Sequence, residues 1–565
     1  MNAADSSGCR PDMNRPASRL RRNLPSLIYA GTAFYGCSVI IAQRNFVPIY
    51  DGWAFYKGCF LKAATSGDCE CFDHIAHFPT AVYGAVVWLF PYNFSAFALF
   101  NLGLGLAACY ALSRGLAPLF PDKDWFCHAS ATAFVLNPVM MAQMIQPSLD
   151  FMLAALTVFL VASLLAGERF YAFLIGCLMA STKEPGIMLY GVLLMGFEGV
   201  VLAAVVKSNG WNVGLRDAVK HSYLILPLPL FLFFAWFFGM HASSFGPSEL
   251  TLADLIRKLV GTDVDLGLLI DQTASLFVLN FNWVLTVGVV CGAVALLLRP
   301  KNPRPGPLPE GEGEAWRLAR QWLLALVIAL AGGVYFHTRV LVYNCPRYVL
   351  PLFVILLCGA IVCLSQLRRR FPKLAAIGFV TYTALVVSSL FYTIDPISKV
   401  SFGTFRFGEH EMLSMGRFRT LPEYAGTVYL CRDQLVYNLQ FIKLSDLAEA
   451  AVEEFGLDAN YVVGPAFSWR DDFRHYDPLT GRRSMRPDAE YVSFTTFDKL
   501  SEDFRSGKGE AFVYLEFPNV LNQEPLDLLN KKYKLRAEHT VSKDGYSIHA
   551  YEFTPLERTF NREFR

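Results

Sequence analysis

Residues 24–43 read Leu-Pro-Ser-Leu-Ile-Tyr-Ala-Gly-Thr-Ala-Phe-Tyr-Gly-Cys-Ser-Val-Ile-Ile-Ala-Gln, and this run decides the fold. It carries no charged side chain and is long enough to cross a membrane, which takes about 20 apolar residues in a helix. Five arginines precede it: Arg10, Arg15, Arg19, Arg21 and Arg22. No small-residue cleavage pattern follows. The pattern predicts a retained membrane anchor whose N-terminal tail, residues 1–23, is cytoplasmic.

The composition extends this prediction to the whole chain. Of 565 residues, 54% are hydrophobic and only 17% are charged, and the mean hydropathy is +0.34. No single soluble core of this length needs so much apolar surface. The formal net charge of +2 is uninformative in sum, because the distribution of the charges along the chain matters more, and no nucleic-acid footprint appears. The chain is therefore expected to be a polytopic membrane protein.

Apolar runs of suitable length recur along the chain and predict about eleven crossings. They are Leu24 to Gln43, Phe94 to Leu112, Phe126 to Met144, Phe151 to Ala166, Phe170 to Ser181, Gly186 to Val206, Tyr223 to Met240, Leu279 to Leu298, Trp322 to Phe336, Tyr348 to Leu367 and Leu374 to Tyr392.

One further apolar run, His77 to Pro91, is too short to cross. Its apolar residues, about a dozen between two prolines, favour a re-entrant or interfacial helix. With this run left out, Lys and Arg gather in alternate short loops, as is typical of the cytoplasmic side. The prediction is a transmembrane region over residues 24–394, with outer loops at 44–93 and 241–277. A Pro- and Gly-rich cytoplasmic connector occupies Pro300 to Glu314.

After Tyr392 the composition becomes that of a soluble domain, and an odd number of crossings places residues 395–565 outside the cytoplasm. Helical and strand patterns alternate there. The expected elements are a helix at Ser445–Phe455, a strand at Tyr461–Val463, a helix at Phe497–Ser506, a strand at Ala511–Phe517, a helix at Pro525–Tyr533 and a turn at Lys543–Gly545 between two strands. The predicted fold class is mostly α: a polytopic membrane helical bundle with a C-terminal soluble α/β domain.

Charged residues beside short outer loops are candidates for function because they are costly to desolvate at a membrane. The first is Asp51, followed closely by Trp53, Tyr56 and Lys57. A carboxylate beside aromatic rings suits a sugar, since the rings stack on it and the acid takes a hydroxyl proton. The same residues also suit a helix cap at the interface, where Trp and Tyr are common. Both interpretations stay open.

The next two candidates are Asp150, at the mouth of the third span, and Lys183, in the segment Ser181 to Gly186. Taken singly, Asp150 is better explained by the N-terminal dipole of the next helix. Lys183 is a cation on the outer side, against the usual charge rule, and would neutralise a phosphate there. Pairing with Glu184 is the alternative, although adjacent helical residues face apart.

The fourth candidate is Arg347, in the segment Asn344 to Tyr348, with His337 and Arg339 before it. Its guanidinium fork suits phosphate oxygens, whereas a snorkelling anchor is the plainer interpretation. On the predicted topology all four candidate sites lie on one side of the membrane. The separate structural interpretations of the individual residues do not explain why they lie together. Acids, rings and cations together suit the breaking of a bond between a sugar and a phosphate.

In their order along the chain, these motifs resemble the GT-C superfamily of membrane glycosyltransferases, particularly the aminoarabinose transferase of lipid A and the protein O-mannosyltransferases. The resemblance runs to Leu367 through short motifs: Asp51 with Tyr56 and Gly58, His77-Phe78-Pro79, Asp150, Thr182-Lys183 with Gly186, and Arg347-Tyr348 with Pro351. Two residues depart from the family. Gly52 stands where a second acid is common, and Phe78 replaces a proline, which weakens a metal-binding role for the first loop.

The resemblance implies an inverting transferase that moves a sugar from a polyprenyl-phosphate donor to an acceptor hydroxyl on the outer face. Asp51 would accept or orient the hydroxyl proton, and Asp150, the second candidate catalytic carboxylate, would steer Lys183 or hold the acceptor. Lys183 and Arg347 would bind the donor phosphate. The remaining substrate contacts would be Trp53, Tyr56, Lys57, His77, Arg339 and Tyr348. No metal or other cofactor is required, although Asp51 with Asp150 also suits a divalent cation.

The implied partners are the lipid-linked donor, membrane lipids and a lipid, glycan or protein acceptor, with no nucleic acid. The implied location is a bacterial inner membrane. A lipid or glycan transporter or flippase is the main competing class, but transporters tend to have internal repeats and ionisable groups near the midplane. No repeat is detectable here, and Glu198 is the conspicuous acid within a span. A non-catalytic membrane scaffold is a third interpretation.

Two outer loops carry further patterns. Cys59 with Cys69 or Cys71 would form a disulfide in an oxidising compartment, and the spacing leaves the pair open. In the loop His241 to Asp271, five residues near helical spacing predict either an interfacial lid over the site or a plain packing element. They are Leu250, Leu252, Leu255, Ile256 and Leu259.

Overall fold

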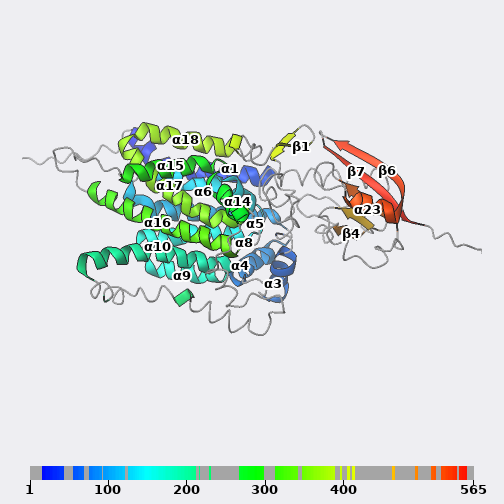
Figure 1. Cartoon of the computed structure of the whole chain (residues 1–565), viewed down its shortest axis with the longest axis horizontal. Helices are drawn as coiled ribbons and strands as arrows, with labels where there is room; N and C mark the ends of the chain where they lie inside the picture. The colour runs from blue at the N-terminus through cyan, green and yellow to red at the C-terminus, as the bar shows by residue number, and fades with distance from the viewer. Residues whose placement is uncertain are drawn as a thin grey trace, which may run out of the picture.

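The computed structural model places most of the chain in one elongated bundle of helices, followed by a small sheet (Figure 1). The residues that the structure describes are 16–42, 52, 55–68, 71, 76–91, 93–120, 125–210, 216, 228–230, 266–297, 312–340, 346–388, 395–397, 404–407, 410–413, 461–464, 490–493, 511–516, 524–543 and 546–556. The predicted fold class, a helical bundle with C-terminal strands and a helix, is confirmed within these ranges.

The helices of the bundle follow the predicted apolar runs. They are α1 (Pro16–Ala42), α3 (Leu61–Ser66), α4 (His77–Leu89), α5 (Phe94–Leu116), α6 (Trp125–Leu136), α7 (Pro138–Met144), α8 (Leu149–Ala166), α9 (Arg169–Ala180), α10 (Glu184–Asn209), α14 (Leu266–Phe277), α15 (Asn282–Leu297), α16 (Glu312–Val340), α17 (Leu350–Arg370) and α18 (Pro372–Ser388). Ten of the eleven predicted crossings correspond to described helices. The other, Tyr223 to Met240, lies mostly outside the described residues, as do the leucines of the predicted lid.

Six of the described helices are long and apolar enough to cross a membrane. These spans are Asn23–Ala42, Phe94–Leu119, Leu149–Ala166, Glu184–Ser208, Glu314–Arg339 and Arg347–Arg369. The outer surface of the bundle is also apolar, with Phe34 76% exposed and Met195 and Ile377 each 64% exposed. Water would oppose such exposure, whereas lipid tails would not. The chain is a multi-pass membrane protein.

Three segments of the bundle test helix boundaries that the sequence predicted. The short run beginning at His77 forms α4, which ends at Leu89 and is not among the helices long enough to span. The run predicted as one crossing from Phe126 to Met144 is instead two helices, α6 and α7. The side chain of Asn137 caps the start of α7 by accepting hydrogen bonds from the Val139 and Met140 amides, and Pro138 is the first residue of α7. The connector prediction is wrong at its end, since α16 already begins at Glu312.

Small residues let the long helices approach one another closely. A Cβ atom added at Gly196 of α10 would lie 2.3 Å from the Ala325 carbonyl oxygen of α16. Such contact is below any van der Waals distance, so only glycine allows these two backbones to meet. Within a membrane, where apolar burial gives little drive between helices, close backbone packing is what holds the bundle together.

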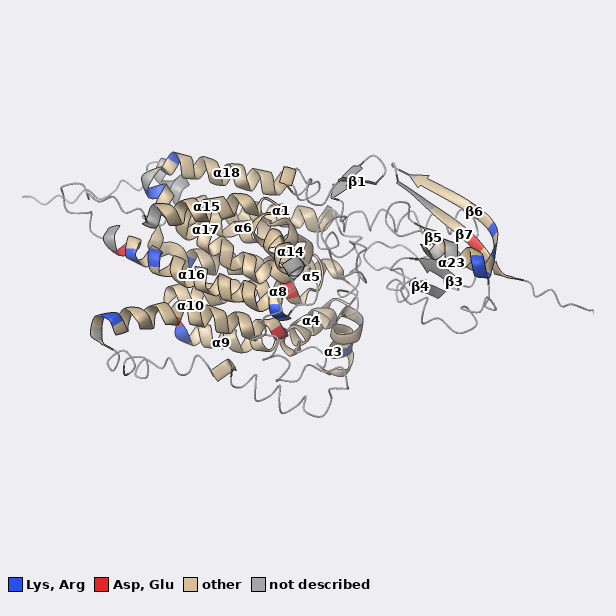
Figure 2. Cartoon of the chain, viewed as in Figure 1, with Lys and Arg blue, Asp and Glu red and all other residues tan. Residues whose placement is uncertain are grey.

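The charges divide the bundle into two ends (Figure 2). Described Lys and Arg residues gather where α16 and α18 begin and α10 ends, for example Arg317, Lys373 and Lys207. The strands β6 (Tyr533–Lys543) and β7 (Tyr546–Pro555) lie beyond the opposite end. The helices α8, α10 and α17 begin at that opposite end, so Asp150 and Lys183 lie there.

The C-terminal strands form a mixed five-stranded sheet in the order β4-β3-β5-β7-β6. Its other members are β3 (Tyr461–Gly464), β4 (Glu490–Ser493) and β5 (Phe512–Glu516), which pair in parallel, whereas β5, β7 and β6 pair antiparallel. The helix α23 (Glu524–Lys532) packs Leu529 against Phe512 and Phe553. The predicted strands at Tyr461–Val463 and Ala511–Phe517 and the helix at Pro525–Tyr533 agree with these elements, and Lys543 pairs with Tyr546 across β6 and β7. The predicted helices Ser445–Phe455 and Phe497–Ser506 and the middle of the predicted turn lie outside the described residues. A separate hairpin joins β1 (Thr404–Phe407) to β2 (His410–Leu413).

Asp395 attaches the start of the C-terminal region to the bundle. Its carboxylate is fully buried and accepts hydrogen bonds from the Phe281 amide at 3.1 Å and the Trp283 indole at 3.2 Å. Phe281 lies in the turn between α14 and α15, where Asn280 and Phe281 have φ of 55° and 61°, and Trp283 lies in the first turn of α15. Left-handed backbone at two successive non-glycine residues is strained, and the buried carboxylate holds it.

A disulfide joins Cys59 to Cys71 and closes the segment between them into a loop. The sequence left Cys69 and Cys71 as alternative partners, and the structure selects Cys71. Cys59 lies in the short π-helix η1 (Tyr56–Phe60), which leads directly into α3.

Replacing Cys59 and Cys71 together by alanine should lower the free energy of unfolding by about 3 kcal/mol, because a closed loop of this size restricts the unfolded chain. Thermal unfolding in detergent would measure the loss. Peptide mapping without reductant should show the linked Cys59 and Cys71 peptides in the parent protein. A Cys59–Cys69 link would contradict the assignment.

Candidate functional site

Three charged side chains from distant parts of the chain meet at the end of the bundle. The Lys183 ammonium lies 2.5 Å from Oδ1 of Asp150, and Arg347 Nε lies 3.5 Å from Oδ2 of the same carboxylate. Lys183 therefore pairs with Asp150, which is 33 positions away in the sequence. We call Asp150, Lys183 and Arg347 the charge cluster.

The charge cluster is largely removed from solvent. The side chains of Asp150, Lys183 and Arg347 are 10%, 12% and 7% exposed. Both cations also lie over the Tyr348 ring, with centroid distances of 4.6 Å for Lys183 Nζ and 5.3 Å for Arg347 Cζ. The ring's negative face adds attraction where water is excluded. Buried charges of this kind are kept only when they are paired or functional.

Three helix N-termini converge on the charge cluster. Asp150 is the second residue of α8, Lys183 immediately precedes α10, and Arg347 lies in η4 (Pro346–Val349), directly before α17. Each N-terminus carries a partial positive charge and unpaired amide groups. Helix N-termini together with cationic side chains form a setting that favours anions, and Asp150 is the anion that the chain itself supplies.

A buried hydrogen-bond network fixes the start of α8 and therefore the position of Asp150. The Tyr83 hydroxyl donates to Asn101 Oδ1 at 2.8 Å, and the Asn101 amide donates to the carbonyls of Met144 and Gln146. Ser148 donates to Gln143 and accepts from the Phe151 amide as the N-cap. Burial raises the pKa of Tyr83 above its ordinary value, so this hydroxyl remains a donor.

The segment that carries Lys183 is held at several points. The Phe78 amide of α4 donates to the Ser181 carbonyl at 3.0 Å, and the Thr182 hydroxyl donates to the Leu178 carbonyl at 2.6 Å. A Cβ atom added at Gly186 would lie 2.2 Å from the Met179 carbonyl oxygen. The glycine therefore lets the start of α10 press against the end of α9, and this sets the direction of Lys183.

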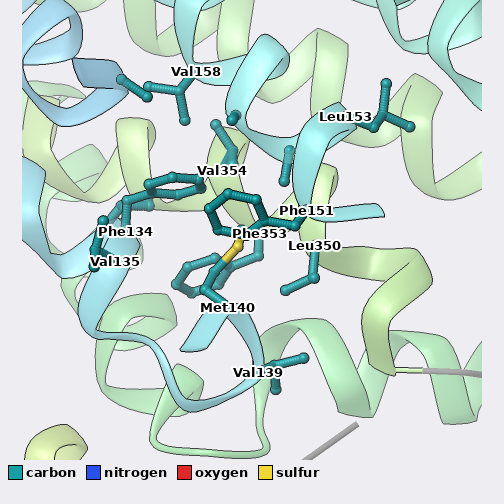
Figure 3. Packing of buried hydrophobic residues seen from close by; sticks show 14 of the residues in the cluster. Phe134, Val135, Val139, Met140, Phe151, Leu153, Val158, Leu350, Phe353 and Val354 are labelled. Atoms are coloured by element: carbon teal, nitrogen blue, oxygen red, sulfur yellow. The ribbon is translucent and has the colours of Figure 1, made fainter. Parts of the chain in front are cut away.

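Tightly packed apolar residues lie directly beneath the charge cluster. Figure 3 shows Phe151 of α8 beside Met140 of α7 and Phe353 of α17, with Leu350 close by. Phe151 follows Asp150 in the chain, and Leu350 follows the segment of Arg347 and Tyr348. The side chains of these four residues are each at most 2% exposed. This close packing holds the helix ends in fixed positions, so the charged groups are pre-organised.

The other predicted site residues lie in several environments. Asp51 and Trp53 lie outside the described residues, as does the Lys57 side chain. Tyr56 is fully buried against the Phe94 and Phe97 rings, in a packing position. His77 opens α4 one residue before Phe78 and is exposed. The guanidinium of Arg339 lies over the Tyr335 ring at 5.4 Å.

Two buried polar residues near the charge cluster were not among the predicted site residues. His337, near the end of α16, is 5% exposed, and Gln272 of α14 is 3% exposed. No described residue bonds to either His337 ring nitrogen or to either Gln272 amide atom. The helix α14 packs against η4, which carries Arg347. The sequence shows His337 shortly before Arg347 but indicates no role for it, whereas nothing in the local sequence marks Gln272.

Within the described ranges, no three His, Cys, Asp or Glu side chains gather closely enough to hold a metal ion. Asp51, the second carboxylate considered for a divalent cation, lies outside those ranges.

Comparison with known proteins gives two matches in fold. No family model and no curated protein sequence matches the chain. The crystal structure of ArnT from Cupriavidus metallidurans bound to undecaprenyl phosphate aligns over 93% of this chain and 97% of its own, with 13% identity and a TM-score of 0.45. The apo structure of the same protein aligns over the same shares, with 14% identity and a TM-score of 0.43. ArnT is a GT-C glycosyltransferase, the superfamily that the motifs resemble. At this low similarity, the chemistry of the site depends on its own residues.

Replacing Gly186 by alanine should displace the start of α10, because the new methyl group would overlap the Met179 carbonyl. We expect a loss of stability of about 1–3 kcal/mol, as for other overpacked sites. Thermal unfolding in detergent measures the loss. Gly199→Ala is the matched control, since no atom lies within 4 Å of a Cβ there, and equal losses in the two variants would contradict the close contact.

Replacing Asp150 by asparagine should destabilise the protein by about 3 kcal/mol, because two cations would remain buried without their carboxylate. The further change Lys183→Met should restore part of that loss, since one unpaired charge is then removed. A double-mutant cycle measured by thermal unfolding gives the coupling. If the two changes add without coupling, the pairing of Asp150 with Lys183 is wrong.

Proposed function

We propose that this chain is an integral membrane glycosyltransferase. It moves a sugar from a polyprenyl-phosphate donor to an acceptor hydroxyl on the outer face of the membrane, with inversion at the anomeric carbon. The observation that carries this proposal is the charge cluster, a carboxylate with two cations at the mouth of an apolar bundle. A lipid-linked phosphate needs cations at the membrane surface and apolar surroundings for its chain, and the bundle offers both.

Lys183 is the better placed cation for the donor phosphate. An ammonium group has three donors, and among the described residues Lys183 uses one of them, on Asp150, besides its contact with the Tyr348 ring. Two donors therefore remain for phosphate oxygens. Arg347 adds a planar fork that suits the same group. The convergent N-termini of α8, α10 and α17 strengthen the attraction for an anion.

The proposed reaction is a single displacement. The acceptor oxygen attacks the anomeric carbon, the bond from that carbon to the phosphate oxygen breaks, and the polyprenyl phosphate leaves with the bonding pair. Negative charge grows on the leaving phosphate, so Lys183 and Arg347 stabilise the transition state more than the ground state. The hydroxyl proton passes to Asp51 in this proposal.

Asp150 has a positioning role in this proposal. Both of its oxygens face cations, Oδ1 toward Lys183 and Oδ2 toward Arg347. Both oxygens of this carboxylate are therefore engaged in holding the chain's own cations. We therefore assign proton transfer to Asp51 and the orientation of the two cations to Asp150.

We further propose that the basic end of the bundle faces the cytoplasm and that residues 395–565 form an outer domain. The positive-inside rule supports this orientation, since Arg317, Lys373 and Lys207 lie at the end opposite Asp150. The proposed setting is a bacterial inner membrane. The competing transporter class rests on the many crossings and the outer-face charges, and Glu198 is the conspicuous acid within a span.

The test is transfer from radiolabelled polyprenyl-phosphate sugars in membranes that contain the protein. We expect Lys183→Met to lower the rate by about 100-fold or more, since one transition-state cation is lost. Lys207→Met is the matched control, because it removes a lysine from the other end of the same helix, and it should leave the rate unchanged. Asp51→Asn should also abolish most transfer.

Two results would contradict the proposal. The first is transfer that survives both Lys183→Met and Asp51→Asn at the parent rate. The second is a parent protein that transfers no sugar from a panel of hexosyl and pentosyl donors but moves labelled lipid across the bilayer of sealed vesicles. That second result would favour a transporter.

A further inference from the structure

His337 is a buried polar residue whose hydrogen-bonding capacity the chain does not use. It lies near the C-terminal end of α16 and is 5% exposed. Both ring nitrogens are buried, and neither bonds to any described residue. An imidazole always carries at least one N–H donor, whichever tautomer is present. A buried donor without a partner destabilises the fold, and such groups are rare in native proteins.

His337 lies on the face of α16 that packs against the start of α17. A Cβ atom added at Gly333, one helical turn before His337, would lie 2.4 Å from Leu352, in the first turn of α17. The charges of Lys183 and Asp150 also act on the imidazole. Arg339, two residues later on α16, lies about 200° further around the helix and stacks on Tyr335. The helix therefore turns His337 toward the start of α17 and Arg339 toward its other side.

We infer that His337 donates a hydrogen bond to the phosphate of the lipid-linked donor, next to Lys183 and Arg347. This inference rests on the proposed function and adds a third binding residue to the phosphate site. A phosphate monoester or diester has more oxygen lone pairs than two cations can satisfy. An uncommitted N–H beside the cations fits that need, and the ligand supplies the partner that the fold does not.

This assignment separates His337 from an ordinary core residue. A histidine that holds the core together makes hydrogen bonds within the protein, so its loss destabilises the protein without ligand. A histidine reserved for ligand makes no such bonds. Its replacement by an apolar side chain should leave the free protein as stable or more stable, while weakening its ligand binding. Stability and affinity should therefore change in opposite directions.

The experiment measures thermal unfolding of the purified full-length protein in detergent, with undecaprenyl phosphate added over a range of concentrations. This lipid is the ligand of the Cupriavidus structure, and undecaprenol, which lacks the phosphate, is the negative control. Binding raises the unfolding temperature with concentration, and the rise gives the Kd. The variants are His337→Leu and His337→Gln, because glutamine retains an N–H donor.

We expect His337→Leu to unfold at the parent temperature or above it without lipid, and to bind undecaprenyl phosphate about tenfold or more weakly, as for the loss of a hydrogen bond to a charged group. His337→Gln should recover most of the affinity. Ser130→Ala is the matched control, since Ser130 is another buried side chain in the described helices without a hydrogen-bond partner. It should retain the parent Kd.

The outcomes distinguish this inference from the proposed function. If the parent binds and Lys183→Met weakens binding while His337→Leu does not, the role of His337 is wrong and the proposed function stands. A His337→Leu protein that unfolds well below the parent without lipid also overturns the inference, since it indicates a structural role. A parent whose unfolding temperature responds no more to undecaprenyl phosphate than to undecaprenol contradicts both.

Discussion

The ion pair between Asp150 and Lys183 is the constraint on which the site depends. It joins the start of α8 to the start of α10, and Arg347 brings the start of α17 to the same carboxylate. Because the three side chains are nearly buried, none can turn away without leaving an unpaired charge in surroundings of low polarity. The pair thus converts three separate helix ends into one electropositive site, and the packed core beneath them keeps the ends in place.

The rest of the bundle serves this arrangement through long-range contacts. Asn101 of α5 holds the turn before α8, Phe78 of α4 holds the segment before Lys183, and Gly196 lets α10 lie directly against α16. The latter helix carries His337 to the same place. Each contact joins segments that are far apart in the sequence, so the geometry of the site results from the packing of the whole bundle rather than from one loop.

The membrane fold was accessible from the sequence because its signals are local. Apolar length predicted most of the helices, and the turn after Lys543 predicted the β6–β7 hairpin. The break at Asn137 had a local signal too, an N-cap followed by proline, which the apolar length obscured. The contacts of individual side chains were harder to predict from the sequence. The sequence placed Asp150, Lys183 and Arg347 on one side of the membrane, but local spacing offered Glu184 as the partner of Lys183. The contact with Asp150, and the unused nitrogens of His337, arise from tertiary packing that no short motif encodes.

We propose that the charge cluster holds the phosphate of a polyprenyl-phosphate ligand. A cryo-EM map of the full-length protein in lipid nanodiscs with undecaprenyl phosphate tests it most directly. We expect phosphate density within about 3 Å of Lys183 Nζ, as for a charge-assisted hydrogen bond, and in contact with Arg347. Headgroup density bound elsewhere on the bundle, with no phosphate in contact with Lys183 or Arg347, would contradict it.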